Sequence, residues 1–291
     1  MKTKLKTLLG AGLALLVPFG LTPHAAAAPA PEPPILFVAP VKNISQIHSI
    51  SVDGTKLTQL TKRTAHAYFP SRSPDYRYTA FYRGGMIWVM EAKPEPSARV
   101  FAVCPSSSSG HDWSPDGLSI FFCGSSVIGP GLWRVSVNPA TGKVGTPQLV
   151  RAGDCWAPSC SPDGTKIAFT VAGGVRVLDL ASGAEISFGC WSSGYPTWNA
   201  SGDKIAFAGV VSYDITGAGY YEICLANPDL SGVTPVTSLK SFSRFPTWSP
   251  DGTRLVFQSN FSGSDSLYMT EIGSGIVTLF RAGAILPNWE P

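Results

Sequence analysis

Histidine is scarce in this sequence, with four residues among 291. His24 lies near the N-terminus, which leaves only His48, His66 and His111 in the rest of the chain. These three are far apart in sequence, and no Cys-x-x-Cys is present, so the usual spacing of a structural metal site is missing. We therefore expect neither a metal nor another cofactor.

Long apolar runs are also missing beyond the first 27 residues. Within those residues the run Leu8–Leu21 follows Lys2, Lys4 and Lys6 and is short for a bilayer span. Small residues, Ala25-Ala26-Ala27, come next, as expected at the cleavage site of a secretory signal peptide. We predict a signal peptide at 1–27, a Pro/Ala linker at 28–34, and export to the periplasm or out of the cell. An uncleaved anchor is the alternative.

A net charge is lacking once this leader is removed. The chain has 22 Lys and Arg; the leader holds three of them and no acid, so 19 remain against 19 Asp and Glu. A neutral surface offers no electrostatic attraction to nucleic acid or to anionic lipid. We expect a soluble monomer that binds neither.

One stretch recurs along the chain, and its fullest copy is Trp248-Ser249-Pro250-Asp251-Gly252. Pro250 presets φ for a turn, Asp251 can accept a local backbone N–H, and Gly252 tolerates positive φ. The position of Trp248 recurs at 72, 113, 160, 198, 248 and 289, in steps of 41, 47, 38, 50 and 41 residues. Repeats of this length with strand and turn signals are typical of four-stranded propeller blades.

The two ends of the repeat region predict how the ring closes. Residues 35–61 contain the second, third and fourth strands of a blade but lack the first, and the chain ends with a lone first strand at 286–289. Pairing these pieces would remove two exposed sheet edges. We predict an all-β, six-bladed β-propeller over 35–291, with four-stranded antiparallel blades and a ring closed by the C-terminal strand.

Phenylalanine and cysteine positions carry two further predictions. A phenylalanine recurs in each second strand, and we expect these rings to be buried between blades: Phe37, Phe81, Phe122, Phe169, Phe207 and Phe257. Six cysteines in an exported chain permit disulfides, although six allow 15 pairings. Cys123 ends a second strand near where Cys104 precedes a new blade, and we predict that these two are bridged.

The repeated Pro-x-Trp-Ser-Pro-Asp-Gly-x-x-Ile/Leu-x-Phe pattern resembles the propeller of the TolB family. The match is carried by residues 113–122, 158–169, 196–207 and 246–257. The resemblance implies an exported six-bladed propeller that binds other envelope proteins or peptides at the channel mouth, without catalysis. It covers the propeller only, because no α/β domain like that of TolB precedes it.

The loops that lead into the first strands of the blades contain the candidate binding residues. Aromatic rings mixed with a few polar groups suit contacts with a peptide. The candidates are His66, His111, Asp112, Trp156, Trp191, Tyr213, Asp214 and Arg244. An alternative for Trp156 and Trp191 is that they plug the channel or cover the adjacent cysteines.

These residues favour an exported protein that binds a protein or peptide partner at one mouth of the channel, in a role such as cell-envelope organisation. The competing hypothesis is a hydrolase or lyase that acts on an extracellular polymer through His111, Asp112 and nearby loops. It requires at least three converging carboxylate or histidine groups. A serine peptidase is not expected, because the Gly-x-Ser-x-Gly motif is absent. A purely structural module is the third possibility.

Overall fold

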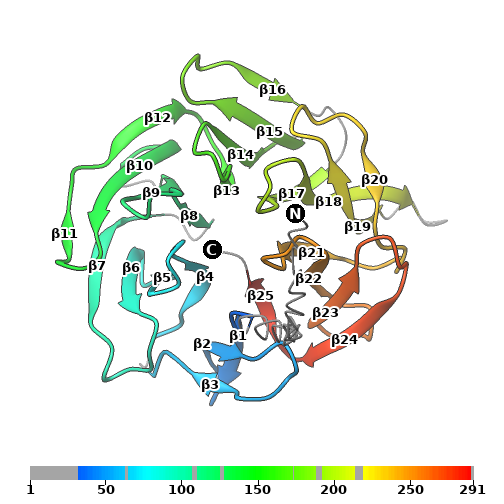
Figure 1. Cartoon of the computed structure of the whole chain (residues 1–291), viewed down its shortest axis with the longest axis horizontal. Coiled ribbons are helices and arrows are strands. Elements are labelled where there is room, and N and C mark those ends of the chain that lie inside the picture. Colours follow the sequence, from blue (N-terminus) through cyan, green and yellow to red (C-terminus); the bar gives the residue numbers. More distant parts are fainter. Residues whose placement is uncertain are drawn as a thin grey trace, which may run out of the picture. The chain divides into compact units, whose positions relative to one another are not determined.

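Six antiparallel sheets follow one another around a ring in the computed structural model of the chain (Figure 1). The structure describes residues 32–62, 65–106, 110–124, 128–172, 174–187, 192–213 and 219–289, without the side chains of 192–193 and 211–213. Every regular element in these ranges is a strand. Within the same ranges, no helix is long and apolar enough to cross a membrane. The predicted all-β architecture is confirmed.

Each blade is named here by its place along the chain, with its strands given from the channel outward. Blade A holds β25 (Ile285–Asn288), β1 (Ile35–Val41), β2 (Ile44–Ile50) and β3 (Thr58–Gln59). Blade B holds β4 (Tyr68–Arg72), β5 (Tyr78–Arg83), β6 (Met86–Glu91) and β7 (Val100–Pro105). Blade C holds β8 (His111–Trp113), β9 (Ser119–Cys123) and β10 (Gly131–Asn138); its outer edge is shared by β11 (Lys143–Val144) and β12 (Gln148–Ala152).

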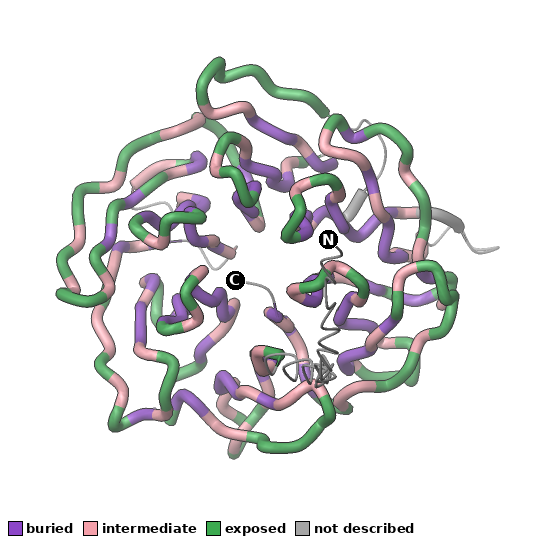
Figure 2. Tube along the Cα trace, viewed as in Figure 1, coloured by how far each residue is buried: buried purple, intermediate pink, exposed green. Residues whose placement is uncertain are grey.

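The other three blades repeat this order. Blade D holds β13 (Trp156–Cys160), β14 (Lys166–Val171), β15 (Gly174–Asp179) and β16 (Glu185–Ser187). Blade E holds β17 (Ser192–Trp198), β18 (Ile205–Tyr213), β19 (Gly219–Ala226) and β20 (Thr234–Pro235). Blade F holds β21 (Arg244–Trp248), β22 (Arg254–Ser259), β23 (Ser266–Glu271) and β24 (Val277–Ala282). Burial is greatest in the inner strands and falls toward the outer ones (Figure 2).

The Ser-Pro-Asp-Gly turns join the first and second strands by one repeated set of hydrogen bonds. In blade F the Ser249 hydroxyl donates to Asp251 and accepts the backbone N–H of Arg254 at 2.9 Å. Gly252 has φ of 70°, a conformation that a side chain disfavours. In blade D, hydrogen bonds from Ser161 and Thr165 lower the pKa of Asp163 to about 2. The aspartates therefore act as turn caps.

The phenylalanines of the second strands fill the spaces between blades, as predicted. All six are buried, with at most 1% of their surface exposed. Phe81 packs with Leu36 and Val38 of blade A, and Phe207 packs with Ala168 of blade D. Each ring thus contacts the preceding blade, where full burial is worth about 1.5–3 kcal/mol.

The ring closes where the two ends of the chain meet. β25 pairs antiparallel with β1, with Leu36 opposite Asn288, which confirms the predicted closure. Trp289 is fully buried, and its indole N–H donates to the Pro33 carbonyl at 3.2 Å. Residues 32–34, which the sequence assigns to a linker, therefore contact the seam; Glu32 also forms an ion pair with Arg254.

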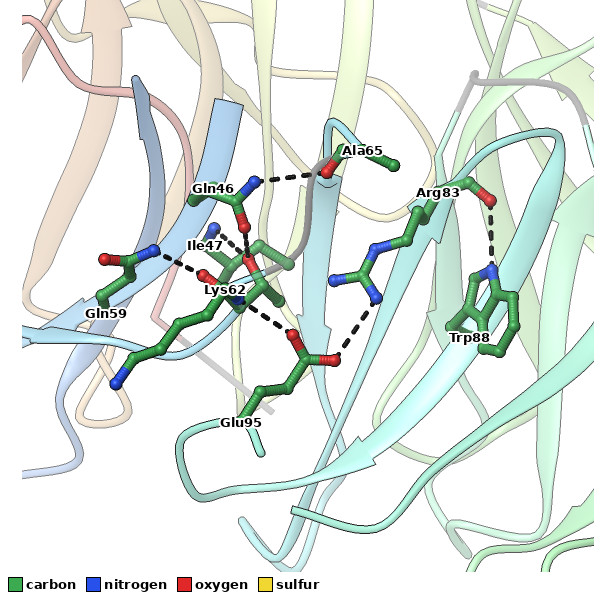
Figure 3. A network of polar contacts seen from close by, with 9 residues as sticks. Gln46, Ile47, Gln59, Lys62, Ala65, Arg83, Trp88 and Glu95 are labelled. Carbon is green, nitrogen blue, oxygen red and sulfur yellow. Dashed lines mark hydrogen bonds and ion pairs between the residues drawn. The ribbon is translucent and has the colours of Figure 1, made fainter. Parts of the chain in front are cut away.

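A polar network ties blade A to blade B (Figure 3). The Thr61 hydroxyl accepts the N–H of Ile47 at 2.9 Å and donates to Gln46 at 2.7 Å. Glu95 accepts the backbone N–H of Lys62 at 2.9 Å and forms a buried ion pair with Arg83 at 3.3 Å. The segment that connects blade A to blade B is therefore bonded to both blades.

The predicted Cys104–Cys123 bridge is wrong, because the structure joins Cys123 to Cys155 with a Cα separation of 5.8 Å. The end of β9 in blade C lies beside the loop that leads into blade D, which carries Cys155. Cys104 lies on the outer strand of blade B and packs with Trp113 and Phe122 as a buried thiol. The bridge thus links blade C to the blade that follows it instead of the one that precedes it.

We expect Trp289→Ala to lower the free energy of unfolding by about 3–5 kcal/mol, because it empties a fully buried site at the seam. Urea denaturation followed by fluorescence would measure the change. The matched control is Trp156→Ala, which removes the same ring from a site that is 38% exposed and should cost far less. Equal losses in the two variants would contradict the role of Trp289 in closure.

Candidate functional site

The six first strands line the channel, and each carries an irregularity at the same repeat position. In each repeat, the residue three positions before the repeat tryptophan, or before the residue that replaces it, has a positive φ. In blade C this residue is Gly110. In the other five blades it has a side chain and a φ of 46° to 57°: Phe69, Ala157, Tyr195, Phe245 and Leu286. Register shifts mark the same place in β4, β13, β17 and β21. We call these six positions the bulge residues.

This conformation is unusual for residues with side chains, and each of the five also precedes a proline. Backbone of this kind costs on the order of 1–3 kcal/mol per residue and is often found at functional sites. Bulges also redirect side chains. Here all six bulge residues line the same cavity on the channel axis.

Three of the bulge residues meet as an aromatic cluster across the channel. The rings of Tyr195 and Phe245 lie 4.0 Å apart between centroids, and Phe69 meets Phe245 edge-on at 6.3 Å. Phe69 comes from blade B and Phe245 from blade F, which are separated by blade A. The cluster therefore connects blades that share no sheet contact.

In five blades the residue after the repeat proline, or after His111 in blade C, has a polar side chain that bonds to the next blade. Asn288 accepts the Arg72 N–H at 3.1 Å, and Thr247 accepts the Trp289 N–H at 2.9 Å. Ser159 accepts the Trp198 N–H at 3.4 Å. These bonds satisfy backbone donors on the inner strand edges, which have no further strand to pair with. We call the set Ser71, Asp112, Ser159, Thr247 and Asn288 the interblade belt.

Asp112 is the charged member of this belt and bridges its two neighbouring blades. One oxygen accepts the N–H of Cys160 at 2.8 Å, and the other accepts the Ser71 hydroxyl at 3.2 Å and the Trp113 N–H at 2.9 Å. Burial raises the pKa of Asp112 to about 6, while these three donors oppose the shift. The carboxylate is therefore held in place by both blades at a cost in solvation.

His111 and Asp112 are neighbours on β8 but have separate polar partners. Burial lowers the pKa of His111 to about 4, and its opposing hydrogen bond is with the Ala80 backbone of blade B. The partners of Asp112 are Ser71, Trp113 and Cys160. Among the described residues, no group of three or more His, Cys, Asp or Glu side chains could hold a metal. The competing hydrolase hypothesis thus finds no converging cluster in this part of the chain.

The channel contains a cavity of about 390 Å³. Its lining runs from the bulge residues to the turns that follow the first strands, including Pro74, Pro115 and Pro162. The cavity therefore reaches the turn side of the ring. The opposite, loop side is where chain segments lead into the first strands.

The predicted binding residues lie mainly on the loop side. Trp156 and Arg244 occupy equivalent positions, each directly before a bulge residue; Trp156 is exposed, and Arg244 pairs with Asp265 at 3.4 Å. Tyr68 occupies the equivalent position in blade B, directly before Phe69. Its ring stacks on that of His66, which is exposed and accepts the Ser45 N–H at 3.1 Å. We call Tyr68, Trp156 and Arg244 the loop-side rim.

Three predicted residues fall wholly or partly outside the described structure. Trp191 and Asp214 lie outside it, as does the side chain of Tyr213, whose backbone ends β18. The bulge residues Phe69, Tyr195 and Phe245 were not predicted as site residues. Their signal in the sequence is an aromatic residue directly before the repeat proline.

The pH dependence of stability would test the buried charge of Asp112. Between pH 4 and 6 the folded protein holds this proton more tightly than the unfolded chain, so the contribution of Asp112 to the unfolding free energy falls as pH rises. Asp112→Asn removes this dependence. The stability of the wild type relative to the variant should therefore fall by on the order of 1–3 kcal/mol from pH 4 to 7.

Urea titrations at several pH values would measure that difference. His111 titrates with the opposite sign but is present in both proteins, so its contribution cancels. Parallel pH profiles for the two proteins would show that Asp112 keeps an ordinary pKa.

Backbone strain at the bulge can be tested at Ala157, where φ is 46°. Ala157→Gly should raise the unfolding free energy by up to about 1 kcal/mol, because glycine adopts positive φ without a Cβ clash. The reciprocal change, Gly110→Ala, should destabilise, since its new Cβ would approach the Ala157 Cα to 3.2 Å. Thermal denaturation would measure both, and a destabilised Ala157→Gly would rule out strain at this position.

Known proteins that are similar to this chain were found by sequence and by structure. No family model matches the chain. A protein named TolB homolog from Chlorobium luteolum is 31% identical over 131 residues, which cover 40% of this chain and 27% of that protein. The match thus spans about a quarter of its relative's length.

Solved structures resemble the chain over most of its length. The TolB structure from Acinetobacter baumannii has a TM-score of 0.69 at 18% identity, covering 89% of this chain and 67% of that one. A putative TolB from Agrobacterium tumefaciens has a TM-score of 0.65 at 19% identity, covering 86% of this chain and 89% of that one. With the closed six-bladed ring, these similarities show that the chain has the β-propeller fold seen in the TolB structures.

Proposed function

We propose that this chain is an exported, non-catalytic binding protein that engages a protein or peptide partner at the loop-side mouth of its channel. The proposal includes a cleaved leader at 1–27, a linker at 28–34 and a mature propeller at 35–291. The similarity to TolB supports a binding role in the cell envelope, and a disulfide suits an oxidising compartment.

The observation that carries this proposal is an exposed tryptophan on a rigid support. Trp156 is 38% exposed, yet its neighbour Cys155 is bridged to blade C, and its own backbone pairs with Thr170. A large ring whose backbone is already ordered contributes binding area at little entropic cost. Such residues are the usual anchors of protein interfaces.

The rest of the loop-side rim is suited to the same task. Arg244 is half-exposed, with its guanidinium 5.5 Å from the centre of the Phe245 ring and its ion pair to Asp265 on the surface. A surface ion pair of this kind contributes little to stability, so Arg244 can exchange partners cheaply. Below the rim, the aromatic cluster Phe69–Phe245–Tyr195 provides an apolar floor.

A pulldown from envelope extract with immobilised mature protein would test the binding face. We expect a partner retained by the wild type to be lost, or weakened at least tenfold, with Trp156→Ala or Trp191→Ala. The matched control is Leu149→Ala on the outer strand of blade C, which is 51% exposed and should keep every partner. If both tryptophan variants keep every partner, the loop-side mouth is not the binding face.

A further inference from the structure

The channel cavity differs in chemistry from the loop-side rim, and its lining residues are all among those described. It contains one carboxylate, that of Asp112, and no Lys or Arg side chain. His111 is the only histidine in the lining, and its lowered pKa of about 4 leaves it neutral near pH 7. The cavity is therefore a partly enclosed space with one negative charge and no positive counterpart.

We propose that the channel cavity is a binding site for a small organic cation, namely a protonated amine carrying an apolar body about the size of a ring. This site goes beyond the partner-binding role proposed above and does not depend on it. The aromatic cluster of bulge residues lines this cavity and lies next to the rim, whereas Asp112 and the turn prolines belong to the cavity alone.

Asp112 has capacity for one more hydrogen-bond donor. A carboxylate offers about four acceptor positions, and the backbone and Ser71 donors occupy three of them: two on one oxygen and one on the other. An ammonium group can fill the remaining position. A neutral ligand would leave the buried charge without a counterion, which is costly in a low-dielectric site.

Prolines make up much of the cavity wall. Eight of the lining residues are prolines, which have no backbone N–H: Pro70, Pro74, Pro115, Pro158, Pro162, Pro196, Pro246 and Pro287. At these eight positions the walls therefore offer a ligand no backbone N–H.

The remaining surface suits the apolar body of such a ligand. Phe69, Tyr195 and Phe245 line the same cavity, and aromatic faces attract cations within about 6 Å of their centres. A volume of about 390 Å³ lies within the range of small-molecule pockets. The unpaired carboxylate of Asp112, the aromatic faces and the cavity volume thus agree on one ligand class.

Isothermal titration of the mature protein with benzylammonium, and with benzyl alcohol as its neutral counterpart, tests the proposal. We expect saturable 1:1 binding of benzylammonium that is at least tenfold tighter than that of benzyl alcohol, and no binding of phenylacetate. Sodium chloride at matched ionic strength controls for screening. Equal affinity for the cation and the alcohol, or no saturable binding of either, would overturn the proposal. This result needs only the wild-type protein.

Two variants then locate the site. Asp112→Asn should weaken benzylammonium binding at least tenfold and leave benzyl alcohol unchanged, whereas Asp53→Asn in an exposed turn should change neither. If Asp112→Asn does not fold, Phe245→Leu serves instead. It should lower the affinity for benzylammonium more than the affinity for benzyl alcohol. Unchanged cation binding in the folded variant would place the site elsewhere. Trp156→Ala should leave this binding intact, which separates the outcome from that of the pulldown.

Discussion

The inner edges of the blades impose the constraint on which the rest of this structure depends. A strand at the edge of a sheet has backbone donors with no neighbouring strand to accept them. In this ring six such edges face one narrow channel, and side chains of the adjacent blade accept several of the donors, as Asn288 does for Arg72 and Asp112 for Cys160. The interblade belt therefore satisfies the backbone and holds neighbouring blades in register at the same time.

The belt also explains why the channel has two different ends. A bulge precedes each belt position and turns the bulge residue into the channel, so Phe69, Tyr195 and Phe245 meet near the loop side. Prolines and belt residues line the remaining length down to the turns. One repeated backbone irregularity thus places aromatic rings at the loop-side end of the cavity, while Asp112 and the prolines line the rest of it.

Closure of the ring relies on contacts from both ends of the described chain. Trp289 fills the space between blades F and A, while Pro33 and Pro34 accept hydrogen bonds from Trp289 and Arg72. The disulfide at Cys155 performs a related task between blades C and D. These contacts reinforce interfaces that otherwise depend on packing and on the belt.

The repeat determined by itself the number of blades, the turn chemistry and the closing strand, because these depend on local patterns with a fixed period. Phe81 and Trp289 could be placed in the core on the same basis. Only the tertiary structure decided which cysteine meets Cys123, that Asp112 spans blades B to D, and that residues before the repeat prolines form the aromatic cluster. Such choices depend on distances between blades across the ring, and a linear period carries no information about those distances.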